Sequence, residues 1–239
     1  MIWLRSGVFY LLLCCSVVLF GVPIILLARF VPNRWLTSIA RTWARSVLIL
    51  LRAICGLGYR VQGLENVPVG GAIVFCKHQS AWETIAIRAL FPPAQTWVLK
   101  RELVRIPVFG LALAAFEPIA IDRSAGRRAV KQLLDRGIRW LELGRLVIVF
   151  PEGTRVAPGE RRSYGIGGAI LAERSGRPVI PVAHNAGVFW SRRSLLKYPG
   201  VIDLVVGAPI ATQGRRAADI NRDAEAWIES SVAQLPGER

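Results

Sequence analysis

His78 and Glu83 are the first two side chains in this chain that could do chemistry together. They lie five residues apart in Cys76-Lys77-His78-Gln79-Ser80-Ala81-Trp82-Glu83-Thr84, which follows a short apolar run and opens a predicted helix. A carboxylate on the first helical turn can swing back to a histidine that lies just before that turn. The imidazole would then act as a general base, and the carboxylate would fix its tautomer and stabilise the imidazolium. The second of the two histidines, His184, is expected to be a hydrogen-bonded structural residue outside the active site.

Glu83 also has a role available that involves no catalysis. Ser80 and Glu83 have the S-x-x-E spacing of a capping box, in which the carboxylate accepts a hydrogen bond from the backbone at the helix start. The local sequence leaves both the dyad and the cap open. No G-x-S-x-G elbow and no H-E-x-x-H pair occurs in the chain. Without an enzyme nucleophile beside it, the base would act on a hydroxyl of the substrate, which indicates direct group transfer.

A second group of candidates is Phe150-Pro151-Glu152-Gly153-Thr154-Arg155, directly after the most clearly predicted strand. Ligands bind at the carboxyl ends of the strands in α/β sheets. Arg155 could pair with a phosphate through two hydrogen bonds, and Gly153 allows the backbone to approach a ligand closely. The alternative is an ordinary turn after a strand, with a solvated pair of arginine and glutamate.

The order of apolar runs and helical segments predicts an α/β fold. Strands are expected at 59–63, 72–76, 96–99, 146–150, 179–183 and 201–206, and helices at 81–91, 124–143, 166–175 and 217–234. Strands that alternate with helices favour a mostly parallel sheet flanked by helices on both faces. Residues 59–239 are therefore predicted to form a single α/β domain.

The N-terminal residues 1–33 are predicted to be a membrane anchor. Residues 7–28 carry no formal charge and, as a helix rising about 1.5 Å per residue, would span a hydrocarbon core of about 30 Å. A secretory signal peptide is the alternative, although its apolar region is shorter. Arginines gather after the run, so the positive-inside rule places everything downstream on the cytoplasmic side, and the expected location is the inner membrane. Pro23 leaves a re-entrant or monotopic insertion open.

Residues 34–58 are predicted to form an amphipathic interfacial helix. Successive arginines are separated by four residues, or by seven, which is the sum of a three- and a four-residue step. Apolar residues such as Leu36, Trp43 and Val47 lie between them at the same spacing. A basic amphipathic helix that contains tryptophan is typical of the lipid interface. The alternative is a helix that packs its apolar face on the main domain, and both can hold for different parts of the helix.

Composition and charge exclude some classes of protein. Of the 239 residues, 53% are hydrophobic and 20% are charged, which excludes a largely disordered chain. A net charge of +15, from 31 Lys and Arg against 16 Asp and Glu, indicates anionic partners. The arginines are spread along the chain beside an apolar N-terminus, which argues against a nucleic-acid-binding protein. The four cysteines form no C-x-x-C pair, and free thiols are expected.

Four ordered blocks resemble the glycerolipid acyltransferases of the 1-acylglycerol-3-phosphate acyltransferase family. The blocks are His78 to Glu83, similar to the family's H-x-x-x-x-D; Phe116 to Arg123, similar to a block ending in I-D-R; Phe150 to Arg155, matching F-P-E-G-T-R; and Val179 to Ala183, similar to a V-I-P-V strand. Their joint occurrence over about residues 59–210 is specific, although each block alone is not. Glu83 departs from the family's aspartate, and Glu117 stands where many members have a small residue.

The resemblance implies acyl transfer from a thioester to a lysolipid hydroxyl. The donor would be acyl-CoA or acyl carrier protein, the acceptor 1-acylglycerol 3-phosphate and the product phosphatidic acid. A different lysolipid, such as a lyso-aminolipid, is the alternative acceptor. His78 would be the general base and Glu83 its support, with no covalent enzyme intermediate. The full set of motif residues argues against a non-catalytic membrane scaffold.

The resemblance also implies the binding residues. They are Lys100, Arg123, Glu152, Gly153, Thr154 and Arg155. Arg123 and Arg155 would bind the lysolipid phosphate, and Lys100 would lie near the phosphate or the oxyanion. No metal ion and no bound cofactor are expected. The expected partners are the lipid bilayer, lysophosphatidic acid and the acyl donor, and not nucleic acid.

Overall fold

A computed structural model describes residues 1–122 and 125–237 and confirms the α/β fold. In this part of the chain, seven strands form one sheet in the order β1-β7-β6-β2-β5-β3-β4. The strands are β1 (Leu57–Gln62), β2 (Ala72–Cys76), β3 (Gln95–Lys100), β4 (Ile119–Ile121), β5 (Leu146–Val149), β6 (Val179–His184) and β7 (Gly200–Val206). Neighbouring strands are parallel except β6 and β7, so the sheet is mostly parallel as predicted.

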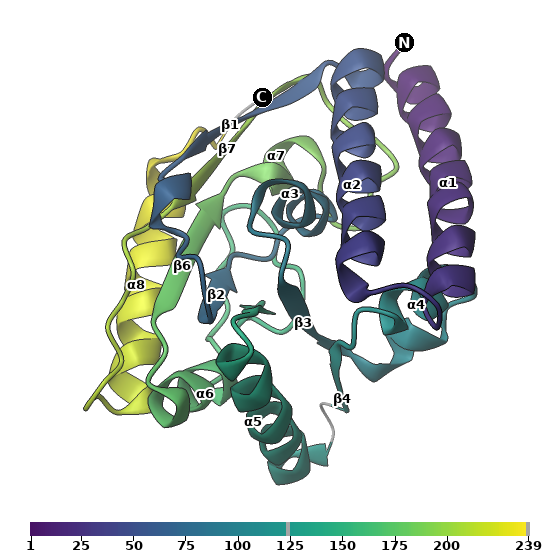
Figure 1. Cartoon of the computed structure of the whole chain (residues 1–239). Coiled ribbons are helices and arrows are strands. Elements are labelled where there is room, and N and C mark those ends of the chain that lie inside the picture. The colour runs from purple at the N-terminus through teal and green to yellow at the C-terminus, as the bar shows by residue number, and fades with distance from the viewer. Residues whose placement is uncertain (123–124, 238–239) are drawn as a thin grey trace.

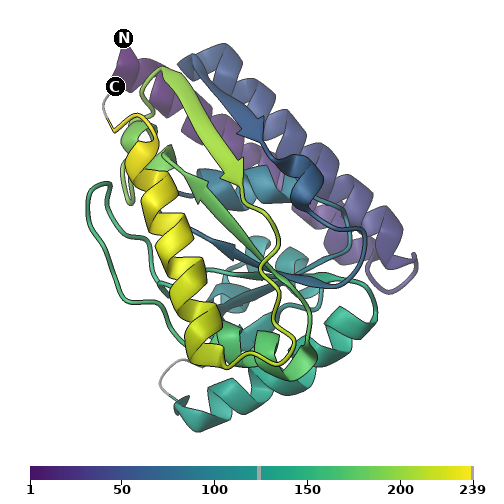
Figure 2. The same cartoon turned by 90° about the vertical axis from the view of Figure 1, so that its left-hand side faces the viewer.

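Helices cover both faces of the sheet. They are α1 (Ile2–Leu27), α2 (Asn33–Cys55), α3 (Trp82–Leu90), α4 (Phe109–Ala114), α5 (Arg127–Glu142), α6 (Gly167–Ser175), α7 (Ala186–Phe189) and α8 (Ala217–Gln234). Figure 1 shows α5, α6 and α8 on one side of the sheet and α1, α2 and α3 on the other. In Figure 2 the yellow helix α8 lies in front of the sheet, and α1 and α2 lie behind it.

The central strand β2 shows why the sheet is covered on both faces. All five of its residues are buried. Val74 and Cys76 belong to the apolar cluster shared with α2 and α3, whereas Ile73 and Phe75 belong to the cluster shared with α5, α6 and α8. Alternate side chains of a strand point to opposite faces, so an uninterrupted apolar run is suited to a strand buried on both. The residues that follow β2 are therefore attached to the end of a strand that is held rigidly.

Helix α1 packs beside α2 but exposes most of its apolar surface. It is long and apolar enough to cross a membrane. Figure 1 shows α1 and α2 side by side and antiparallel. Large exposed side chains of α1 include Trp3, Leu4, Leu11, Leu19 and Leu26. A soluble protein rarely exposes so long an apolar strip, which is consistent with membrane association.

Helix α2 packs one face on the rest of the protein. This is the second of the two alternatives that the sequence leaves open for it. Its buried residues include Leu36, Ala44, Val47 and Leu51. Part of this face joins the apolar cluster shared with α3 and the sheet. Arg34, Arg45 and Arg52 are exposed on the rest of the helix, so the two predicted faces exist.

Candidate active site

His78 and Glu83 meet at the carboxyl end of β2. His78 Nδ1 lies 2.7 Å from Glu83 Oε1. His78 follows β2 and Glu83 lies in the first turn of α3, so the end of a strand and the start of a helix bring them together. The Glu83 side chain is fully buried, whereas the His78 side chain is 16% exposed. The carboxylate therefore supports the imidazole from inside the protein.

The cap and the dyad use the same carboxylate. Glu83 Oε1 accepts hydrogen bonds from the backbone N–H groups of Gln79 (3.1 Å) and Ser80 (2.9 Å). Ser80 Oγ in turn accepts one from the N–H of Trp82 at 3.2 Å. With Nδ1–H donating to Glu83, the neutral imidazole of His78 keeps a free lone pair on Nε2. The two alternatives for Glu83 are thus compatible in this structure.

Glu83 is held in its ionised form. Burial raises the pKa of Glu83, but its contacts with His184, His78 and the N–H of Ser80 outweigh burial and hold that pKa below its ordinary value. A carboxylate that accepts several hydrogen bonds keeps its charge even without solvent. A charged Glu83 is what an imidazole needs in order to accept a proton beside it.

His184 lies against the dyad, although the sequence indicated a purely structural role. Its Nε2 donates to the carbonyl of Lys77 at 2.8 Å, and its Nδ1 accepts from the N–H of Ala186 at 3.1 Å. Burial lowers the pKa of His184, which favours the neutral form of the ring. Nε2 also lies 3.9 Å from Glu83 Oε2. His184 comes from β6, the strand next to β2. No pattern in the sequence around His184 predicts that it lies close to Glu83.

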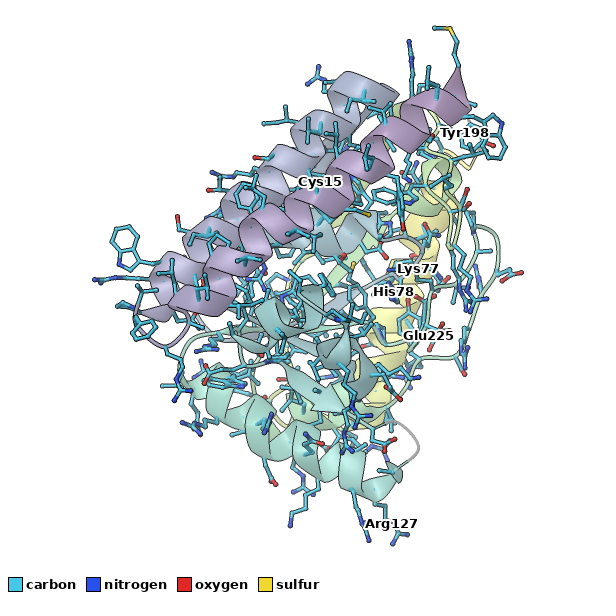
Figure 3. The ribbon with its side chains drawn as sticks, turned by 90° about the vertical axis from the view of Figure 1, so that its right-hand side faces the viewer. Cys15, Lys77, His78, Arg127, Tyr198 and Glu225 are labelled. Carbon is cyan, nitrogen blue, oxygen red and sulfur yellow. The ribbon has the colours of Figure 1, made fainter. Side chains whose placement is uncertain are left out.

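The segment from Phe150 to Arg155 holds His78 in place. The N–H of His78 donates to Glu152 Oε2 at 2.7 Å, and its carbonyl accepts from the N–H of Val156 at 2.8 Å. The imidazole stacks on the Phe150 ring, with centroids 4.1 Å apart and planes inclined by 20°. The backbone and ring of His78 are therefore fixed by residues that follow β5. Figure 3 shows Lys77 and His78 close together near the middle of the molecule.

His78 opens on a cavity of about 440 Å³. One part of its wall is apolar and consists of Trp43, Ile85, Trp97, Val98, Leu99, Leu103, Phe109, Leu113 and Phe150. The polar part includes Lys100, Gly153, Thr154, Arg155, Arg192 and Arg193. Four of the predicted binding residues, Lys100, Gly153, Thr154 and Arg155, thus face one cavity with His78. Arg123 lies outside the described residues.

Glu152, which is predicted to bind substrate, does not line this cavity. Its side chain is fully buried, and its Oε1 lies 2.8 Å from Lys77 Nζ. Gly153 has a φ of 72°, and this left-handed conformation turns the chain between the buried Glu152 and the cavity-facing Thr154. The carboxylate points inward because a buried lysine is available to pair with it, and Lys77 was not among the predicted site residues.

Arg192 and Arg193 were missed by the sequence analysis. They lie between α7 and β7, outside every recognised motif, and an adjacent basic pair was the only signal for them. Arg192 Nη1 donates to the carbonyl of Arg155 at 2.9 Å, which brings this loop next to the F-P-E-G-T-R segment. The cavity is therefore more cationic than the motifs alone indicated.

A second, smaller cavity continues the apolar wall toward the N-terminal helices. It measures about 80 Å³ and lies between α1, α2, α3 and α4. Four residues border both cavities: Trp43, Arg88, Phe109 and Leu113. Trp97 borders the larger cavity and Phe116 the smaller, while both are also buried in apolar clusters. The mainly apolar lining thus extends from the larger cavity toward the α1–α2 pair.

No metal centre is evident among the described residues. Within residues 1–122 and 125–237, no three His, Cys, Asp or Glu side chains are grouped so that they could hold a metal ion. The cysteines Cys14, Cys15, Cys55 and Cys76 are all free thiols.

Comparison with known proteins places this site in a family. A sequence model of the Acyltransferase family matches residues 58–185. A 1-acyl-sn-glycerol-3-phosphate acyltransferase of Pseudomonas aeruginosa is 41% identical over 236 residues, which cover 97% of this chain and 91% of that protein. A protein of the same name from Saccharomyces cerevisiae is 26% identical over 206 residues, covering 84% and 66%. The crystal structure of the LPA acyltransferase PlsC from Thermotoga maritima, 21% identical, has the same fold, with a TM-score of 0.81 over 97% of this chain and 95% of that one. This chain therefore belongs to the acyltransferase family that includes the 1-acyl-sn-glycerol-3-phosphate acyltransferases.

Proposed function

We propose that this enzyme transfers an acyl chain from a thioester to the free hydroxyl of 1-acylglycerol 3-phosphate and so makes phosphatidic acid. The observation that carries the proposal is the position of His78. Its Nδ1 is bonded to a buried carboxylate, and its ring borders a cavity with an apolar wall and a cationic wall. A lysophosphatidic acid has the matching parts, an acyl chain, a hydroxyl and a phosphate. The name of the Pseudomonas aeruginosa relative supports the same acceptor.

The reaction proceeds by direct attack of the acceptor on the donor. His78 Nε2 takes the proton of the hydroxyl while its oxygen forms a bond to the thioester carbonyl carbon. When the tetrahedral intermediate collapses, the C–S bond breaks and the leaving thiolate takes the proton from the imidazolium. The products are phosphatidic acid and the free thiol of coenzyme A or of acyl carrier protein. Glu83 remains ionised and stabilises the imidazolium throughout.

The cationic wall binds the anionic parts of the substrates. Arg155 can pair with a phosphate through two hydrogen bonds, and Arg192 and Arg193 lie on the same cavity. Lys100 also borders the cavity, with its Nζ 3.4 Å from Glu102 Oε1. These groups favour a phosphate-bearing acceptor over a lysolipid that has no phosphate.

The enzyme works at the bilayer, where acceptor and product reside. Trp43 of α2 borders the main cavity, so the membrane-facing helices reach the site itself. We place the catalytic domain on the cytoplasmic side of the inner membrane, because the basic segment with Arg29, Arg34, Arg41 and Arg45 after the apolar run of α1 is attracted to the anionic headgroups of that leaflet. Acyl donors made in the cytoplasm then have direct access to the cavity.

An acceptor-exchange assay with Arg155→Ala tests this proposal. Purified enzyme is given labelled acyl-CoA or acyl carrier protein, with lysophosphatidic acid or with a lysolipid that carries no phosphate. We expect phosphatidic acid from lysophosphatidic acid, and a rise of at least tenfold in KM for that acceptor in the variant, since a bidentate contact to a charged group contributes about 1.5–3 kcal/mol. Faster acylation of the phosphate-free lysolipid by the wild type, or a KM unchanged by the substitution, would contradict the phosphate assignment.

A further inference from the structure

Lys77 is a fully buried cation held between two carboxylates from distant parts of the chain. Its side chain is 1% exposed. Its Nζ lies 2.8 Å from Glu152 Oε1 and 2.7 Å from Glu229 Oε1. Glu152 follows β5, whereas Glu229 belongs to the C-terminal helix α8. One ammonium group therefore ties the ends of two central strands to a helix that lies outside the family match at residues 58–185.

This cluster is connected directly to the backbone of His78. The same Glu152 carboxylate that pairs with Lys77 through Oε1 accepts the N–H of His78 through Oε2, at 2.7 Å. The contacts thus run from Glu229 to Lys77, from Lys77 to Glu152, and from Glu152 to His78. Each step is 2.8 Å or shorter. A displacement of Glu229 would reach the catalytic residue through two side chains.

Glu229 is itself fixed in place. Tyr164 donates its hydroxyl to Glu229 Oε1 at 2.9 Å, and Asn221 of α8 donates to the carbonyl of Tyr164 at 3.3 Å. Arg161 Nε lies 3.9 Å from Glu229 Oε2 at the exposed edge of the cluster. The position of Glu229 therefore depends on the docking of α8 and on the loop before α6.

A buried ion cluster is a poor way to gain stability. Removing a lysine and two carboxylates from water costs several kcal/mol per ion, and buried pairs can often be replaced by apolar residues without loss of stability. Such pairs do fix relative positions, because the charged groups keep a defined separation and direction. A general base needs such a fixed position, because displacing a reacting group by about 1 Å can lower the rate about a hundredfold.

We propose that Glu229, acting through Lys77 and Glu152, is a positioning residue that holds His78 in its catalytic orientation. The proposal rests on the proposed function, in which His78 is the base. It assigns to α8 a part in the reaction that neither the motifs nor the family match indicates. Glu229 does not touch the substrate, so its loss should change kcat more than KM.

The test compares Glu229→Gln with Glu225→Gln in the full-length enzyme in detergent. Both substitutions remove one negative charge from α8, and the two positions are one helical turn apart; Figure 3 labels Glu225. We expect Glu229→Gln to lower kcat about tenfold, with KM for both substrates within about twofold, as is typical for loss of a residue that supports a catalytic group. Glu225→Gln should behave as the wild type.

A second readout follows the His78 ring without any substrate. The chain has two histidines, so protein labelled with ¹⁵N-histidine gives two sets of imidazole signals, and His78→Ala identifies those of His78. Glu229→Gln should shift the His78 signals, and Glu225→Gln should leave them in place. A wild type that does not acylate lysophosphatidic acid would overturn the proposed function, while these spectra would still decide whether Glu229 positions His78.

Several outcomes would overturn the inference. If Glu229→Gln only lowers the melting temperature, with kcat and the His78 signals as in the wild type, the cluster merely fastens α8. A fall in kcat with unshifted His78 signals, or shifted signals with unchanged kcat, would also refute positioning through His78. If the glutamine variant does not fold, Glu229→Asp, which keeps the charge but draws the carboxylate away from Lys77 by one methylene group, is measured in the same two ways with the same expectations.

Discussion

The Glu83 carboxylate supports a helix start and an imidazole with the same oxygen atom. Oε1 accepts from Nδ1 of His78 and from two backbone N–H groups. The family's aspartate is shorter by one methylene group. In this chain the longer glutamate side chain also reaches the histidine from the first turn of α3. We therefore expect the charge to matter more to the proposed reaction than the exact chain length, provided that the oxygen still reaches Nδ1.

Substitutions at Glu83 should separate the two roles. Glu83→Gln keeps an oxygen that can cap the helix but removes the charge that stabilises the imidazolium, so we expect kcat to fall by about a hundredfold or more. Glu83→Asp keeps the charge and should lose less. Steady-state kinetics and thermal melting of both variants are the measurements. A glutamine variant with wild-type kcat and a lower melting temperature would mean that Glu83 serves only as the cap.

Residues close in sequence were easier to predict than residues close only in space. His78 and Glu83 are separated by one loop and one helical turn, so their spacing indicates contact. The orientation of Glu152 depends on Lys77 and Glu229, the latter 77 residues further along the chain. His184 comes from a neighbouring strand, and no local pattern places a strand end against Glu83.

At the scale of elements, the long strands and helices follow from their patterns, and the short ones do not. Strand β2 has the predicted bounds, 72–76, and α8 the predicted bounds, 217–234. Strand β4, with three residues, exists because Val98, Leu99 and Lys100 of β3 pair with it. Helix α4 has six residues, too few to form without packing against its neighbours. Such elements are stabilised by tertiary contacts rather than by their own sequence.

The pairing of α1 with α2 bears on how the chain meets the bilayer. If α1 crossed the membrane, α2 beside it would carry its exposed arginines into the hydrocarbon, at about 2.5–3.5 kcal/mol for each one near the centre. The exposed positions include Arg34, Arg45 and Arg52. We therefore expect both helices to lie in the cytoplasmic leaflet, with the apolar face of α1 in the acyl chains and the arginines near the headgroups.

Cysteine labelling distinguishes the two arrangements. Trp3→Cys and Phe30→Cys lie near opposite ends of α1, and both wild-type side chains are exposed. In a background without the four native cysteines, a membrane-impermeant thiol reagent is added to intact spheroplasts. We expect neither position to react until the membrane is permeabilised. Reaction of Trp3→Cys from the outside would show that α1 spans the bilayer.

For the whole molecule, the fold class and the mostly parallel sheet could be predicted, whereas the strand order could not. The alternation of strands and helices indicates layers. It does not show that β1 and β7 pair with each other at one edge and run opposite to the rest, because that pairing joins segments about 140 residues apart. The result is a sheet whose parallel centre carries His78 and the F-P-E-G-T-R segment at one edge, with α1 and α2 on the side of one face.

The most direct test of the account measures phosphatidic acid formation by membranes that contain the wild type or His78→Ala. Both are supplied with lysophosphatidic acid and labelled acyl-CoA, and equal amounts of folded protein are verified in each membrane. We expect product from the wild type and at least a hundredfold less from the variant, since His78 is the proposed base. Undiminished formation of phosphatidic acid by His78→Ala would contradict it.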